Sequence, residues 1–190
     1  MPRLVERMYQ DKRLTWLWLV VRVWMGWQWF EAGLHKIGNE AWWGAKAGTA
    51  LNGYWMKAAG MGLDAAGKPL KPGATYVWYQ NFLKGLVNSN SSHWFSYLIV
   101  LGELLVGIGL MVGGLTFVAL IGGALMNMNY MLAGSASSNP VLFFLAIILM
   151  LAWDNTWYIG IDRVILPFIG SIFGRKRSPM ASAPAVGGRG

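Results

Sequence analysis

The chain has 190 residues, of which 55% are hydrophobic and 13% are charged, and its mean hydropathy is +0.40. This composition is far from that of an average soluble domain and predicts an integral membrane protein, so we interpret the net charge of +8 as a membrane-orientation signal and not as a sign of nucleic-acid binding. The absence of cysteine excludes disulfide chemistry, Cys-ligated iron–sulfur clusters and covalently attached haem, and no haem, cluster or metal is expected in this chain.

Four apolar stretches are long enough to cross a bilayer as helices, so the predicted fold is all-α, an integral membrane four-helix bundle. The predicted spans cover residues 14–34, 94–112, 115–133 and 141–160. Short links at 113–114 and 134–140 predict that the last three spans are antiparallel neighbours. We expect one domain over 1–174, followed by a disordered basic tail at 175–190.

The long loop between the first two spans, 38–93, is expected to hold two short amphipathic helices lying across one mouth of the bundle. They are predicted over 47–59 and 75–88, and in the second of them Trp78, Phe82 and Leu86 share one face. Another helix, over 161–174, is expected to lie at the opposite interface.

Basic residues cluster beside the membrane near both ends of the chain, which predicts that both termini are cytoplasmic. The long loop would then be extracytoplasmic, although it also carries several lysines. The expected location is the plasma membrane of a prokaryote, with several passes through the bilayer.

Arg22, Glu31 and Glu103 are the ionisable residues that lie well inside the predicted spans. A charge near the middle of a bilayer costs at least ~2.5 kcal/mol, so it needs a partner or a function. Counting ~1.5 Å per helical residue places Arg22 and Glu103 at nearly the same depth, which predicts an ion pair between them. Such a pair either fixes the register of the helices or supports catalysis. Gly26 and Gly33 share the face of Arg22 and should let a neighbouring helix approach closely.

A second polar cluster is expected near the outer surface. Glu31 and His35 are four residues apart and share a helical face. The start of the second span and the end of the third should meet them, bringing in His93, Trp94, Asn127, Asn129 and Tyr130. Such a mouth offers the hydrogen-bond donors, proton carriers and aromatic walls that a quinone head group requires.

In this hypothesis Glu31 and His35 are catalytic proton carriers, and Lys36 contacts an anion. The quinone, a diffusible substrate, would be bound by His93, Trp94, Asn129 and Tyr130. Three other interpretations remain open. The aromatic residues are membrane anchors, the asparagines form hydrogen bonds between helices, or the acidic residue and the histidines hold a metal.

Four short segments resemble the DoxX/DoxD family of four-helix membrane proteins. They are Ala-Gly-Leu-His-Lys at 32–36, Leu-Gly-Glu at 101–103, the run at 123–134 that contains Asn-Met-Asn-Tyr, and Asn-Pro at 139–140. The resemblance implies a membrane subunit of a quinone-linked oxidoreductase, which joins two thiosulfates into tetrathionate and passes the electrons to membrane quinone. It also implies a separate DoxA-like small subunit as partner.

Two other functions compete with this prediction. The chain could be a non-catalytic scaffold that recruits soluble redox partners, or a small-molecule permease that uses Arg22 and Glu103 between its helices. A homo-oligomer is compatible with each of the three functions.

Overall fold

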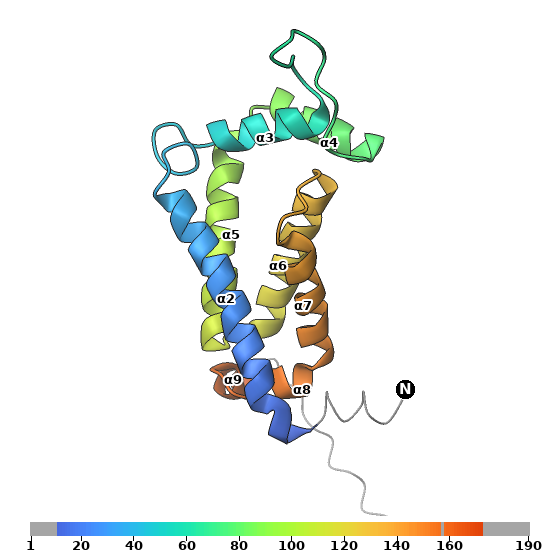
Figure 1. The fold of residues 1–190 in the computed structure, drawn as a ribbon. Coiled ribbons are helices and arrows are strands. Elements are labelled where there is room, and N and C mark those ends of the chain that lie inside the picture. The colour runs from blue at the N-terminus through green and yellow to red at the C-terminus, as the bar shows by residue number, and fades with distance from the viewer. Residues whose placement is uncertain (1–10, 157, 173–190) are drawn as a thin grey trace, which may run out of the picture.

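The computed structural model describes residues 11–156 and 158–172, and within these ranges the chain is all-α, without a β-sheet. After a 3-10 turn, η1 (Lys12–Leu14), the long helices run side by side (Figure 1). They are α2 (Thr15–Ile37), α5 (Ser92–Val112), α6 (Thr116–Leu132) and α7 (Asn139–Leu151). Helix α2 packs mainly against α5, and α6 mainly against α7. The predicted all-α class is therefore confirmed.

Shorter helices cover both ends of this arrangement (Figure 1). Helices α3 (Thr49–Ala59) and α4 (Val77–Asn88) cross one end, as the sequence predicted. Helices α8 (Trp153–Thr156) and α9 (Asp162–Ile172) lie at the other end. We refer to these as the α3–α4 end and the α8–α9 end. The predicted tail, 175–190, lies outside the described residues.

The predicted apolar face of α4, with Trp78, Phe82 and Leu86, is not its most buried one, although Leu86 packs partly against the apolar cluster of α3 and α4. Trp78 and Phe82 are 62% and 47% exposed, whereas Tyr79 and Leu83 are buried. The hydroxyl of Tyr79 donates a hydrogen bond to the backbone carbonyl of Asn129 at 3.1 Å. The buried phenol thus keeps a partner for its polar atom, which favours Tyr79 over Trp78 at the contact.

The predicted fourth span, 141–160, is wrong as a single helix. Helix α7 ends at Leu151, and the chain then turns through α8. The hydroxyl of Thr156 lies 2.9 Å from the carbonyl oxygens of both Leu149 and Ala152, which closes this turn. The 13 residues of α7 rise ~20 Å, short of a hydrocarbon core of ~30 Å. Of the described helices, α5 alone is long and apolar enough to cross a membrane, and by itself this is weak evidence for a membrane protein.

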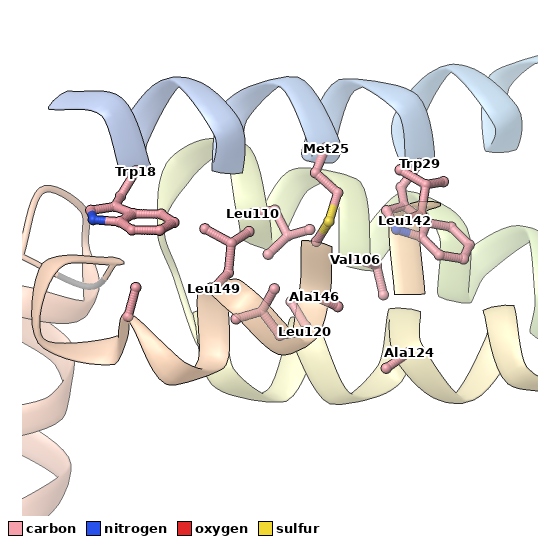
Figure 2. Packing of buried hydrophobic residues seen from close by; sticks show 12 residues of the cluster. Trp18, Met25, Trp29, Val106, Leu110, Leu120, Ala124, Leu142, Ala146 and Leu149 are labelled. Carbon is pink, nitrogen blue, oxygen red and sulfur yellow. The ribbon is translucent and has the colours of Figure 1, made fainter. Parts of the chain in front are cut away.

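Apolar side chains from all four long helices form the main core (Figure 2). Met25 of α2, Leu110 of α5, Leu120 of α6 and Leu149 of α7 are fully buried there. A second cluster, which includes Leu51 and other residues of α3 and α4, lies at the α3–α4 end. The α3–α4 layer therefore has a packed apolar core of its own, separate from the main core.

Glycines bring α2 and α5 into close contact, as predicted for Gly26 and Gly33. A Cβ on Gly26 would lie 2.9 Å from the carbonyl oxygen of Gly107, and one on Gly33 would lie 2.8 Å from Leu104. Gly107 is the matching glycine on α5, since a Cβ there would lie 2.6 Å from the backbone nitrogen of Phe30. These contacts set the register of the two antiparallel helices.

At the α8–α9 end, Asp162 holds the start of α6. Its carboxylate accepts hydrogen bonds from the backbone N–H groups of Leu115 at 2.6 Å and Thr116 at 2.8 Å. A carboxylate at this position satisfies N–H groups that have no partner within the helix. Asp162 therefore links the last described helix to the middle of the chain.

Candidate functional site

Arg22 is buried at the α8–α9 end, where its guanidinium binds backbone carbonyls. Nη1 donates to the oxygen of Thr156 and Nη2 to that of Ile159, both at 2.7 Å. A Cβ on Gly113 would lie 2.6 Å from Nη1, so the guanidinium lies against the end of α5. Arg22 thus joins α2 to the segment that follows α7, which is a structural role.

The predicted Arg22–Glu103 pair is wrong because the two residues lie at different levels. Glu103 is level with Gly33, which contacts its neighbour Leu104. Gly33 follows Arg22 by eleven residues on α2, a rise of ~16 Å. The prediction assumed that α2 and α5 end at the same level, but α2 extends about two turns past Gly113 at the α8–α9 end.

Glu103 is paired instead with Lys36 and Tyr130, from α2 and α6. Lys36 Nζ donates to both carboxylate oxygens, at 2.8 and 2.7 Å, and the Tyr130 hydroxyl donates to Oε1 at 2.9 Å. The side chain of Glu103 is 2% exposed and that of Lys36 is 20% exposed. We call this group the Lys36–Glu103–Tyr130 triad. The ammonium of Lys36, predicted as an anion contact, is neutralised by Glu103.

A cavity of about 500 Å³ opens beside the triad, and we call it the polar cavity. Its wall includes Glu31 and His35, so the structure brings the predicted proton carriers together with Lys36 and Tyr130. The sequence prediction missed several further lining residues, among them Gln28, Trp29, Trp42, Tyr54 and Asn139. Gln28 lies three residues before Glu31 and seven before His35, so helical spacing could have placed it on the same face. Trp42, Tyr54 and Asn139 come from separate segments, whose convergence no local spacing indicated.

Asn129 faces a second, smaller cavity of about 250 Å³ at the α3–α4 end, the aromatic cavity. Tyr54 and Tyr130 belong to the walls of both cavities. In the aromatic cavity the Tyr79 hydroxyl lies 3.2 Å from Oδ1 of Asn129, and Nδ2 of Asn129 donates to the carbonyl of Leu125 at 2.8 Å. Burial raises the pKa of Tyr79 to about 12 and also raises the pKa of Tyr54, so both phenols keep their protons at neutral pH.

The two remaining predicted quinone contacts lie away from these walls. His93 makes an edge-on ring contact with Tyr97, with a centroid distance of 5.3 Å, and Trp94 is 54% exposed. Neither residue lines the polar or the aromatic cavity. The first turn of α5 therefore does not contribute the predicted ring contacts.

Two buried side chains on the wall of the polar cavity have unpaired polar atoms. Among the described residues, neither Nδ2 nor Oδ1 of Asn127 has a hydrogen-bond partner, and the same holds for Nε1 of Trp29. Their side chains are almost inaccessible, since the residues are 1% and 3% exposed. Buried polar groups are nearly always hydrogen-bonded, so the hydrogen-bonding capacity of these atoms is unused among the described residues. The alternative interpretation, in which the side chain of Asn127 forms a hydrogen bond to another helix, is wrong for the described residues.

The charges on this wall favour a neutral or weakly polar ligand over a dianion. Besides His35, the wall holds one basic side chain, Lys36, and two acidic ones, Glu31 and Glu103. Within the described part of the chain, no three His, Asp or Glu side chains gather closely enough to hold a metal ion. The cavity can therefore bind a molecule through hydrogen bonds and exchange protons with it through Glu31 and His35.

Comparisons with protein-family models, with curated proteins and with solved structures found no match for this chain. The resemblance to the DoxX/DoxD family therefore stays a prediction from short segments. Each of the four segments contributes residues to the polar cavity, among them Lys36, Glu103, Tyr130 and Asn139.

Proposed function

We propose that this protein is the membrane subunit of a quinone-linked oxidoreductase that takes electrons from thiosulfate and reduces membrane quinone in the polar cavity. The observation that carries the proposal is the meeting of the Lys36–Glu103–Tyr130 triad with Glu31 and His35 on one wall. A quinone needs hydrogen-bond donors for its carbonyl oxygens and a route for protons, and these side chains supply both.

A bilayer position for the four long helices is supported by their outward faces. Val20 of α2, Leu105 of α5, Val118 of α6 and Phe144 of α7 are each more than half exposed. Large exposed apolar side chains on every one of the long helices suit contact with lipid. In this proposal the α3–α4 end faces outward from a prokaryotic plasma membrane, and the shorter α7 is accommodated by local thinning of the bilayer.

The overall proposed reaction balances in atoms, charge and electrons. Two thiosulfates release two electrons as they join through a sulfur–sulfur bond to form tetrathionate. One quinone takes up these two electrons and two protons and leaves as quinol. Because Glu31 and His35 line the polar cavity, they are the groups proposed to carry these protons from solvent.

The dianionic donor would react outside the polar cavity, whose wall is not positively charged. Exposed lysines at the α3–α4 end, such as Lys57 and Lys71, offer the positive charge that attracts thiosulfate. We propose that a DoxA-like small subunit docks at this end and completes the donor site.

Thiosulfate-dependent bleaching of a short-chain quinone by membranes that contain the protein tests this function. Glu31→Gln and His35→Gln should each lower the rate by about 100-fold, the size of a typical proton-transfer contribution. His93→Gln is the matched control, because His93 lies outside both cavities, and it should leave the rate unchanged.

An equal loss in His93→Gln would overturn the assigned proton route. Absence of thiosulfate-dependent reduction, in membranes where the parent protein is inserted and a small subunit is supplied, would overturn the donor. Tight binding of soluble redox proteins without any quinone reduction would instead support the scaffold function.

A further inference from the structure

We infer that Asn127 and Trp29 bind an oxygen atom of the quinone head group in the polar cavity, and that Asn127 recognises both the oxidised and the reduced form. This inference rests on the proposed function only in naming quinone as the ligand. The positions of the two side chains are independent of that function.

The two unpaired groups belong to α2 and α6, and both residues line the polar cavity. A Cβ on Gly123 of α6 would lie 3.2 Å from Trp29 Nε1, so the indole N–H reaches the backbone of α6. Asn127 follows Gly123 by four residues, about one helical turn or ~6 Å along the same helix. Figure 2 shows Trp29 extending from α2 toward Leu142, which also lines the polar cavity.

The hydrogen-bonding capacities of these groups match an oxygen that changes between carbonyl and hydroxyl. The amide of Asn127 offers N–H donors and a carbonyl acceptor, whereas the indole of Trp29 only donates. A quinone carbonyl would accept from Asn127 Nδ2 and Trp29 Nε1. A quinol hydroxyl would donate to Asn127 Oδ1. Asn127 can therefore hold both redox forms without a change in its own protonation.

The aromatic cavity offers fewer free polar atoms for the same task. The side chain of Asn129 is hydrogen-bonded to Tyr79 and to the carbonyl of Leu125. The hydroxyl of Tyr54 lies 3.3 Å from the carbonyl of Tyr130. A head group placed there would have to displace existing hydrogen bonds, whereas one in the polar cavity would complete missing ones.

Equilibrium binding to the purified full-length chain in lipid nanodiscs tests the inference without any donor. The probes are a short-chain 1,4-benzoquinone and the corresponding hydroquinone. Asn127→Leu should weaken the binding of both by about 10-fold or more, as expected when a buried hydrogen-bonding group is lost from a binding site. Trp29→Phe should weaken the quinone more than the hydroquinone. Asn129→Leu tests the aromatic cavity as the alternative site and should leave binding in the polar cavity intact. Asn52→Leu on α3 is the matched control, because Asn52 lines neither cavity, and it should bind both as the parent does.

Thermal unfolding separates this role from a structural one. Because Asn127 has no hydrogen-bond partner among the described residues, Asn127→Leu should unfold at the parent temperature or above it while its affinity falls. A lower unfolding temperature together with parent affinity would overturn the inference.

Other outcomes also decide the matter. Parent affinity in Asn127→Leu would mean that the amide holds only water. A loss confined to Asn129→Leu would move the head group to the aromatic cavity, overturn this inference and leave the proposed function standing. Asn127-dependent binding without thiosulfate turnover would support the inference and overturn the donor. No binding of either probe to the parent would overturn both the inference and the quinone half of the proposed function.

Discussion

At the scale of single residues, Glu103 carries a buried carboxylate whose burial depends on its partners. It is held by Lys36 and Tyr130 and has almost no access to solvent. A charge in such a place is costly once its partner is removed, whereas an exposed ion pair contributes little. The chain contains an example of each kind.

Lys36→Met should therefore destabilise the protein by ~3–5 kcal/mol, because it leaves Glu103 charged and buried with a hydroxyl as its remaining partner. The matched control is Lys46→Met, since Lys46 pairs with Glu40 at 3.7 Å while both side chains are largely exposed. The control should change stability by less than ~1 kcal/mol. Thermal unfolding of the purified protein in detergent measures both, and equal shifts would contradict the burial of the pair.

Exchanging the charges of Arg22 and Glu103 tests their separation. If the two residues formed a pair, Arg22→Glu combined with Glu103→Arg would restore folding that each single change impairs. Because Arg22 binds the carbonyls of Thr156 and Ile159, the double variant should unfold at least as easily as the worse single variant. Recovery of the parent unfolding temperature in the double variant would disprove this alignment of α2 with α5.

At the scale of helices, glycines decide how closely α2 and α5 approach. The contact is tight at Gly107, which lies against the backbone of Phe30. The glycine spacing on α2 indicated this close approach, but Gly107 was found only in the structure. Helical periodicity shows which face of one helix carries small residues. Which residue of the other helix lies against that face depends on how the two helices are aligned along each other.

Gly107→Ala should cost ~1–3 kcal/mol, because the added methyl would force α2 and α5 apart. Gly85→Ala on α4 is the control, since no atom lies within 4 Å of the added Cβ. That change should be neutral or stabilising by ~0.5–1 kcal/mol, because alanine favours a helix. Unfolding in detergent compares the two, and a stable Gly107→Ala protein would argue against the close contact.

At the scale of the whole molecule, the proposed membrane topology places the α3–α4 end outside. The natural chain has no cysteine, so single cysteines report accessibility without background. Lys68→Cys, between α3 and α4, should react with an impermeant maleimide on intact cells. Arg13→Cys, beside the start of α2, should react only after the cells are opened. The opposite pattern would mean an inverted protein, and labelling of both from outside would contradict an even number of spans.

The amino-acid sequence by itself determined the all-α class, the helices of the long loop and the chemical types of the site residues. Helical periodicity and composition are local properties, and they predicted α3, α5 and the polar positions Glu31, His35, Glu103 and Tyr130. The end of the fourth predicted span at Leu151 was not predicted, because apolar composition does not show where a helix ends and the chain turns.

Only the tertiary structure decided which of these residues meet. Arg22 and Glu103 are the two candidates that a count along straight helices would pair, yet the contacts of Gly26, Gly33 and Gly107 shift α2 along α5. Through that shift Glu103 meets Lys36, and Arg22 meets backbone carbonyls. A partner between antiparallel helices depends on their relative register, and the register is set by close packing over the whole interface, which no local segment of sequence contains.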